Sequence, residues 1–223
     1  MVESITVVQF HEAVPGDEWH RVYGGATAYF VTGSFDKGVA FVNAIARLAD
    51  ALGHDPDIDL RPAGVTVRVM TRETRELTER DVALALQIST TACELGIRSE
   101  PHHVHAVQLA IDAMDIAAVL PFWRAVLDYE QVGSDDLVDP RRIGPSVWFQ
   151  QLDQPRPQRN RIHIDVALSR TQATARIEAA LEAGGRIVND SFAPAWWTLA
   201  DPEGNEVDIA PWSDDTVWED DSE

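Results

Sequence analysis

The first half of the chain alternates between strand-like and helix-like hydrophobic patterns. Residues 65–69 place apolar and polar side chains in alternation, which is typical of a strand with one buried face, and residues 27–32 also predict a strand. Apolar residues recur at helical spacing over 41–52 and again over 78–96, and a glycine suited to ending a helix closes each run. Residues 1–97 therefore predict a small α+β domain.

The second half repeats one order of elements twice. The first copy is predicted as a strand at 107–111, a helix at 115–127 and a strand at 146–150. The second copy is predicted as a strand at 162–168, a helix starting near 171, and strands at 186–188, 196–199 and 206–210. Pro121 lies in the first two turns of the first helix and suggests a late start or a kink. The element order predicts a duplicated β-α-β-β-β arrangement.

The chain is thus predicted to be α+β, with two domains at residues 1–97 and 105–212. Residues 98–104 are expected to be a linker. Residues 213–223 carry six carboxylates and predict a self-repelling acidic tail.

Composition excludes several classes of function. The net charge of −19 argues against nucleic acid and against an anionic membrane surface, because both need clustered Lys and Arg. A single cysteine, Cys93, excludes an intrachain disulfide. The N-terminus has no signal-peptide pattern, and no apolar run reaches membrane-spanning length. We expect a cytoplasmic protein.

Two strand-like segments near the C-terminus carry the best candidates for chemistry. In residues 160–166, alternation sends His163 and Asp165 to the face opposite the isoleucines. In residues 201–209, it directs Asp208 away from the apolar face in the same way. An imidazole and a carboxylate on neighbouring strands can hold a metal or move a proton.

A second group of histidines occurs in the predicted linker. His102, His103 and His105 follow Pro101, and no neighbouring residue is expected to supply further metal ligands. Linker histidines of this kind are typically solvated, so the sequence predicts no metal site there.

The second half resembles the glyoxalase-like branch of the vicinal oxygen chelate superfamily. The resemblance covers most of residues 105–212, and it is carried by Asp115, Phe122-Trp123, Leu127, Asn160-Arg161-Ile162-His163-Ile164-Asp165 and Ala200-Asp201-Pro202-Glu203-Gly204-Asn205-Glu206. It implies paired modules whose strands curl into a cup, where a metal commonly binds and a substrate oxygen is polarised.

Carried over by position, this resemblance implies metal ligands at Gln108, Gln150, His163 and Asp208. Such a set would suit Mn²⁺, Fe²⁺, Ni²⁺, Co²⁺ or Zn²⁺. The family usually has a second histidine or a glutamate where this chain has glutamine or aspartate. Many glyoxalase-like relatives bind organic ligands without metal.

In a cup without metal, three tryptophans would supply an apolar pocket wall. These are Trp148, Trp196 and Trp197. Packing of the same side chains in the core is the alternative.

The first half resembles pterin-4a-carbinolamine dehydratase over residues 4–97. The matching positions are Trp19, Phe30, Phe35, Phe41-Val42-Asn43, His54-Asp55-Pro56-Asp57-Ile58, Val65–Thr71 and Leu77–Asp81. That enzyme removes water from a 4a-hydroxytetrahydropterin with a cluster of histidines as general acid and base. Its catalytic positions fall on His54, Asp55 and Arg72, so only one of three histidines is retained. Arg72 stays charged and would favour an anionic ligand.

Three functions remain open. The first is a lyase- or isomerase-like small-molecule enzyme with its pocket in the second domain, while the first domain acts as a scaffold. The second is an active 4a-hydroxytetrahydrobiopterin dehydratase with an appended glyoxalase-like domain. The third is a non-catalytic ligand-binding or resistance-type protein. The expected partners are a small molecule and further copies of the chain, in a homodimer or higher oligomer, with neither nucleic acid nor membrane.

Overall fold

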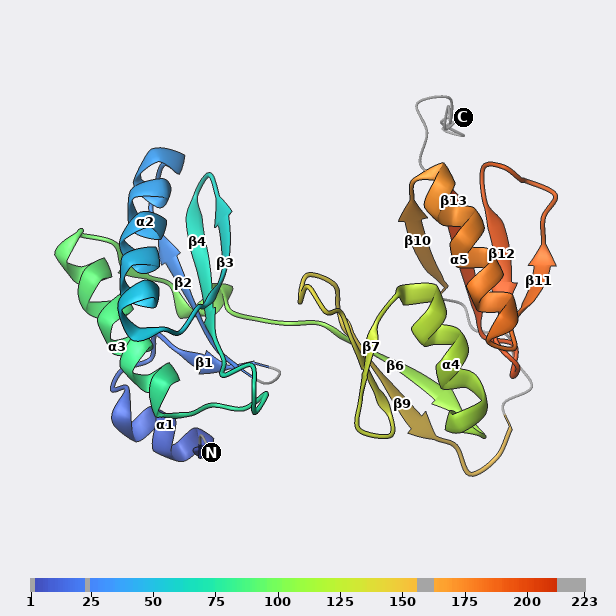
Figure 1. Ribbon diagram of the computed structural model, residues 1–223, viewed down its shortest axis with the longest axis horizontal. Helices are drawn as coiled ribbons and strands as arrows, with labels where there is room; N and C mark the ends of the chain where they lie inside the picture. The colour runs from blue at the N-terminus through green and yellow to red at the C-terminus, as the bar shows by residue number, and fades with distance from the viewer. Residues whose placement is uncertain (1–2, 23–24, 156–162, 212–223) are drawn as a thin grey trace. The chain divides into compact units, whose positions relative to one another are not determined.

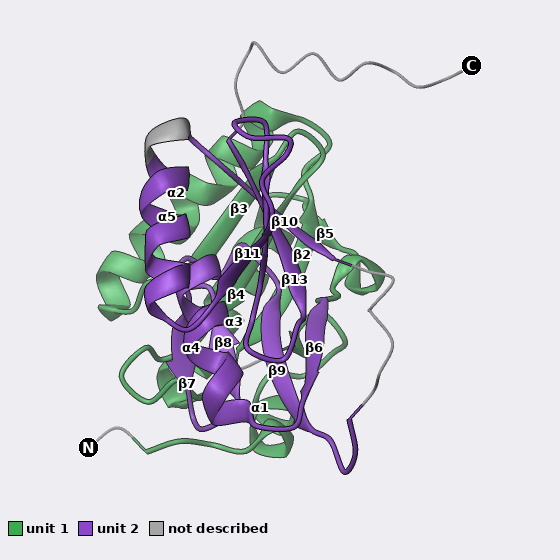
Figure 2. Ribbon diagram, turned by 90° about the vertical axis from the view of Figure 1, so that its right-hand side faces the viewer, with its two compact units in different colours: residues 1–106 green, residues 107–223 purple. Residues whose placement is uncertain are grey.

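The structure is a computed structural model of the 223-residue chain, and it describes residues 3–22, 25–155 and 163–211 (Figure 1). It divides into two compact units, Met1–Ala106 and Val107–Glu223 (Figure 2). Both units combine helices with β-sheet, which confirms the α+β class. The start of the strand predicted from Ile162 and the acidic tail at 213–223 lie outside the described residues.

The first unit consists of one antiparallel sheet and three α-helices. Its elements are α1 (Val7–Ala13), β1 (His20–Arg21), β2 (Ala26–Val31), α2 (Phe35–Leu52), β3 (Asp57–Arg61), β4 (Gly64–Val69), α3 (Glu79–Glu94), β5 (Arg98–Ser99) and the 3-10 helix η1 (Pro101–His103). The strand order is β1-β2-β4-β3, and β5 also pairs with β2. The predicted helices and strands are present, whereas α1, β1, β3, β5 and η1 were not predicted.

The core of this unit lies between the sheet and the helices α2 and α3. Every second residue of β2 is buried, ending with Phe30, which packs against Phe41 of α2 with ring centroids 5.1 Å apart. Gly53 ends α2 with φ of 60°, a left-handed conformation that glycine adopts without strain. Helix α3 begins at a capping box between Thr78 and Asp81, as the sequence predicts for Thr78.

The segment expected as a linker belongs to the first unit. Arg98 and Ser99 form β5 and pair with Val31 and Phe30 of β2. The amide of Glu100 continues this pairing by donating to the carbonyl of Tyr29 at 2.9 Å. Residues 98–100 therefore extend the sheet edge, because their backbone groups find partners on β2, and η1 follows them directly.

The second unit consists of two modules with the same element order. The first module contains β6 (Gln108–Ala113), α4 (Ile116–Leu127), β7 (Glu130–Val132), β8 (Asp136–Val138) and β9 (Ser146–Gln151). The second contains β10 (Ile164–Leu168), α5 (Arg170–Glu182), β11 (Arg186–Asn189), β12 (Trp197–Ala200) and β13 (Glu206–Pro211). The duplicated β-α-β-β-β arrangement predicted from the sequence is present. Its strands β7 and β8 in the first module were not predicted individually.

The two module sheets have matching strand orders, β6-β9-β8-β7 and β10-β13-β12-β11. In each, the first strand pairs in parallel with the last. Leu109 lies opposite Val147 in one module, and Ile164 lies opposite Val207 in the other. All four contribute to the one hydrophobic core that both modules share.

An acidic turn before β13 ties the modules together. Asp201 is fully buried, and it accepts hydrogen bonds from three consecutive amides, Glu203 to Asn205, and from the indole of Trp123 on α4. Glu203 in turn accepts from the amides of Met114 and Asp115 at the start of α4. The Asp-Pro-Glu-Gly-Asn motif therefore organises the fold.

The expectation of a late start for α4 is wrong. The helix begins at Ile116, because Asp115 caps it by accepting from the amide of Ala118, and Pro121 lies in the second turn. No helix within the described ranges combines the length and apolar character needed to cross a bilayer.

Candidate functional site

Three acidic and imidazole side chains meet on one face of the second module. The Nε2 atom of His163 lies 3.5 Å from an oxygen of Asp165 and 3.8 Å from an oxygen of Asp208. One ligand atom from each residue falls within 4.8 Å of the others. His163 and Asp165 are about half exposed, whereas the side chain of Asp208 is 19% exposed. His163 and Asp208 are two of the ligands that the family resemblance implied, whereas Asp165 was not among them.

Strand pairing explains why these residues meet. β10 and β13 are parallel neighbours, and Asp165 lies directly opposite Asp208. Ile164 and Val207 point into the core, so the residues beside them in sequence project to the other face. Alternation in the sequence already places Asp165 on the same face as His163. Only the strand register of the structure shows that Asp165 lies opposite Asp208.

Gln108 and Gln150 come from the first module, whereas the cluster comes from the second. Both lie in the sheet of the first module, Gln108 opposite Ser146 and Gln150 opposite Asp112. They are four residues apart along the register of one strand pair, which separates them by roughly 13 Å at strand spacing. The position equivalent to Asp208 in the first module is Trp148, and so the assignment to Gln150 was two residues away from it.

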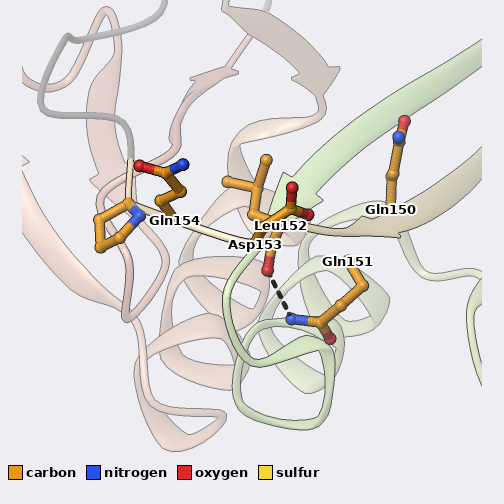
Figure 3. A pocket seen from close by; sticks show the side chains of 6 residues that line it. Gln150, Gln151, Leu152, Asp153 and Gln154 are labelled. Atoms are coloured by element: carbon orange, nitrogen blue, oxygen red, sulfur yellow. Dashed lines mark hydrogen bonds between the residues drawn. The ribbon is translucent and has the colours of Figure 1, made fainter.

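Gln150 instead borders a small hollow at the end of β9 (Figure 3). Residues 150–155 line this hollow of about 390 Å³, and Gln151 donates a hydrogen bond to the carbonyl of Leu152 at 3.1 Å. The lining is largely amide and backbone. It has no group suited to acid–base chemistry beyond the carboxylate of Asp153.

The three tryptophans do not form one pocket wall. Trp148 is partly exposed on β9, on the face away from the core. Trp196 stacks on Phe192 with ring centroids 4.2 Å apart. Trp197 packs against the shared core from β12. For Trp197 the alternative of core packing is therefore the one observed.

A larger cleft opens beside the acidic cluster. It measures about 1020 Å³, and its lining includes Asp165 together with residues of both modules. The apolar part of the lining includes Leu109, Val147, Ile164, Val166 and Leu168, and the polar part includes Tyr129, Asp139, Arg141, Gln172 and Arg176. A mostly apolar wall with a few polar groups is the usual composition of a small-molecule site.

One end of the cleft is built around a second acidic turn. Burial raises the pKa of Asp139, but hydrogen bonds from the amides of Gly144, Arg141 and Ile143 and the charge of Arg141 outweigh it and hold that pKa below its usual value. Burial, followed by the charge of Asp139, raises the pKa of Tyr129. The Tyr129 phenol therefore stays protonated at neutral pH and can donate a hydrogen bond into the cleft.

The first unit holds a buried histidine–carboxylate pair. Nε2 of His54 lies 2.7 Å from Oδ1 of Asp81, and both side chains are buried. The second oxygen of Asp81 accepts from the hydroxyl of Thr71 and from the amide of Thr78. The residue that completes the helix cap thus also orients the imidazole. Nothing in the sequence showed that His54 reaches Asp81, because the two residues lie 27 positions apart.

Asp55 and Arg72 do not join the buried pair of His54. Asp55 is exposed, and the imidazole of His54 contacts Asp81 instead. Arg72 is 63% exposed and donates to Asp57 at 2.7 Å. His54 and Arg72 therefore have separate partners in this structure.

The donor chemistry at His163 fits a divalent metal. Two ligands that each lie about 2.1 Å from one ion are about 3.0–3.4 Å apart, close to the 3.5 and 3.8 Å separations from His163. One imidazole with two carboxylates is an oxygen-rich set of the kind that Mn²⁺, Fe²⁺ and Zn²⁺ accept. The net charge of −19 also favours a cation.

The fold and these clusters define a two-domain α+β protein with a dehydratase-like unit and a glyoxalase-like unit. Residues 4–91 match the model of the pterin 4 alpha carbinolamine dehydratase family, and residues 108–210 match that of the glyoxalase-like domain. A protein of Thermomicrobium roseum, provisionally named pterin-4-alpha-carbinolamine dehydratase, is 33% identical over 91 residues, which are 41% of this chain and 96% of that protein. The chain therefore belongs to this dehydratase family and carries a glyoxalase-like domain in addition.

Solved structures resemble each half separately. The transcriptional coactivator/pterin dehydratase of Brucella melitensis is 25% identical, covers 40% of this chain and 99% of its own, and has a TM-score of 0.38. A glyoxalase-related enzyme of Fulvimarina pelagi is 16% identical, covers 48% of this chain and 86% of its own, and has a TM-score of 0.38.

Proposed function

We propose that the chain is a small-molecule enzyme of the lyase or isomerase type, which acts at His163, Asp165 and Asp208 with a divalent metal. The observation that carries this proposal is the position of Asp165. Asp165 belongs to the three-residue cluster and is also one of the residues that line the cleft of about 1020 Å³. A ligand in that cleft would therefore lie next to the metal-binding groups.

The residues of the cluster have distinct tasks in this proposal. His163, Asp165 and Asp208 would hold the ion, which supplies Lewis-acid polarisation of a substrate carbonyl or enolate oxygen. Asp208, the least exposed of the three, sits on a strand between two others and provides the rigid part of the set. The two exposed residues, His163 and Asp165, are accessible to a ligand.

The cleft residues bind and orient the substrate. The apolar side chains from β6, β9 and β10 exclude water from the carbon part of a ligand. The Tyr129 hydroxyl donates a hydrogen bond to a ligand oxygen, since its raised pKa keeps the proton on the phenol. Arg141 and Arg176 lie within ion-pair distance of Asp139 and Asp128, and their remaining N–H groups can donate to a ligand oxygen.

Metal analysis combined with turnover tests this function. Protein purified without chelators should contain one equivalent of a divalent metal in the second unit, and His163→Ala should remove it. The same variant should lose metal-dependent turnover of small carbonyl compounds, whereas Gln108→Ala should keep both. Tight ligand binding without metal and without turnover would instead favour the ligand-binding or resistance-type function.

A second candidate is retained dehydratase activity in the first unit. The supporting observation is the buried His54–Asp81 pair, in which a carboxylate orients an imidazole, as in many sites of general acid–base catalysis. Arg72 and Asp55 occupy the other two catalytic positions and argue against dehydratase activity, because a guanidinium does not exchange protons at neutral pH.

Direct assay separates this candidate from the first. Dehydration of a 4a-hydroxytetrahydropterin that is lost in His54→Ala and unaffected by His163→Ala would establish it. Absence of dehydration in the folded wild-type chain would leave the first unit as a scaffold.

A further inference from the structure

We propose that Glu100, His102 and His103 form a second binding site for a transition-metal cation such as Zn²⁺, Co²⁺ or Ni²⁺. This site lies in the first unit, at the end of the strand β5, and it is independent of the function proposed above. Glu100 precedes η1, and both histidines lie within it. One ligand atom from each of the three residues falls within 4.8 Å of the others.

The distances suit one shared ion. Nε2 of His103 lies 3.2 Å from Oε2 of Glu100, and Nε2 of His102 lies 3.6 Å from the same oxygen. Ligand atoms that bind a tetrahedral ion at about 2.0–2.2 Å are about 3.4 Å apart. The two imidazoles and the carboxylate therefore already have nearly the separations that such an ion requires.

The backbone at this site is held before any ion binds. The amide of Glu100 donates to the carbonyl of Tyr29, and the amide of His103 donates to the carbonyl of Glu100 at 3.1 Å. The ring of Tyr29 also lies against the imidazole of His103, with centroids 4.8 Å apart. A held backbone lowers the ordering cost of binding.

The carboxylate of Glu100 is oriented from its other side. Arg98 contacts Oε1 at 2.6 Å, which leaves Oε2 directed at the two histidines. Glu100 is only 19% exposed, whereas His102 and His103 are 70% and 50% exposed. The carboxylate therefore provides a fixed ligand, and the two accessible imidazoles can close on an ion from solvent.

Two imidazoles and one carboxylate favour borderline metals over Ca²⁺ or Mg²⁺. Nitrogen ligands suit Zn²⁺, Co²⁺ and Ni²⁺, whereas calcium and magnesium prefer all-oxygen sites. Three protein ligands leave a fourth tetrahedral position for water. From the sequence, only the two adjacent histidines stood out as possible ligands. The oriented carboxylate of Glu100 became apparent only from the pairing of β5 with β2.

A zinc titration of the full-length, untagged chain tests this site. The chain should carry His163→Ala and Asp208→Asn, so that the cluster of the second unit does not contribute. In competition with a chromophoric chelator, this protein should bind one equivalent of Zn²⁺. Adding His102→Ala and His103→Ala together, or Glu100→Gln alone, should weaken zinc binding by more than roughly 100-fold. Loss of a residue that only supports a metal ligand typically costs roughly 10- to 100-fold, and loss of a ligand itself should cost more.

His11→Ala is the matched control, because His11 is also exposed but lies on α1 outside the cluster. It should leave the affinity unchanged, and Co²⁺ should give the visible absorption of a tetrahedral site only in chains with the cluster intact. Unchanged zinc stoichiometry and affinity in the His102/His103 variant would overturn the proposal. Circular dichroism should show that the variants are folded, as is expected for two exposed side chains.

Discussion

The two modules of the second unit share one fold but differ in what their equivalent positions carry. Where the second module pairs Asp165 with Asp208, the first pairs Ala110 with Trp148. The apolar positions beside them are conserved in type, since Leu109 and Val147 face the core like Ile164 and Val207.

This difference indicates that the duplicated core positions maintain the fold, while the opposite face of each sheet is free to change its chemistry. In the second module that face gathers three possible metal ligands. In the first module, the positions equivalent to His163, Asp165 and Asp208 carry an amide, a methyl group and an indole, with no carboxylate or imidazole among them. We therefore place the chemistry of the second unit in one module.

The largest expected difference between the modules is how much the acidic turn of each contributes to the free energy of unfolding. Asp201→Ala would leave the indole of Trp123 and three turn amides without their acceptor, at a cost of about 3–5 kcal/mol in the free energy of unfolding. Asp139→Ala, in the equivalent turn of the first module, should cost less, because Asp139 accepts from three amides and from no buried indole. Chemical denaturation of both variants measures the difference.

An equal or larger loss in Asp139→Ala would contradict this ranking. It would mean that the first module depends on its turn as strongly as the second depends on the link from Asp201 to α4.

The next effect concerns metal affinity. His163→Ala should weaken binding of Mn²⁺ to the second unit by at least about tenfold, because one of three ligands is lost. Gln108→Ala, at the equivalent position of the first module, should leave the dissociation constant unchanged. Isothermal titration calorimetry compares them, and an equal loss in both variants would show that the two modules share the site.

A steric effect should follow at the cleft. A methyl group added at Gly144 would lie about 2.0 Å from the hydroxyl of Tyr129. We expect Gly144→Ala to lower the free energy of unfolding by about 1–2 kcal/mol, since overpacked sites typically lose about 1–3 kcal/mol.

The combined variant Gly144→Ala with Tyr129→Phe should recover most of that loss, because the clashing oxygen is gone. A double-mutant cycle by thermal unfolding measures the coupling. Additive losses would show that the hydroxyl does not lie where the structure puts it.

The smallest effect is a pH dependence in the first module. Asp139 has a lowered pKa when folded, so its ionised form stabilises the fold above the unfolded pKa of about 3.9, and this contribution is lost as pH falls through the lowered value. The stability difference between wild type and Asp139→Asn should therefore be constant near neutral pH and shrink in acid.

Asp136 is the matched control of opposite sign. Burial, followed by the charge of Asp135, raises its pKa, so Asp136→Asn should gain stability relative to wild type as pH rises above about 4. Parallel pH profiles for the two variants would contradict the electrostatic account.

Much of this arrangement was predictable from residue patterns. Alternation placed His163 and Asp208 on strands and turned both away from the core, and the order of elements indicated the duplication. Alternation could not show which strands are neighbours. The assignment of Gln150 therefore missed the equivalent position, Trp148, by two residues, and Asp165 was not recognised as a ligand candidate.

The contacts of the first unit were harder to predict, because they join residues far apart in sequence. Asp81 has the spacing of a helix-capping residue, and its bond to His54 depends on how α2 and α3 pack. Glu100 lies beside two histidines in sequence, yet its orientation depends on Arg98 and on pairing with β2.

Paramagnetic broadening by Mn²⁺ tests most directly whether the second module alone carries the metal site of the second unit. In amide NMR spectra of the full chain with Glu100→Gln and His103→Ala, substoichiometric Mn²⁺ should first broaden the signals of residues 164–167 and 207–209. The signals of 108–113 and 146–151 should broaden later. Broadening that starts in β6 and β9, or that shows no preference between the modules, would contradict the account.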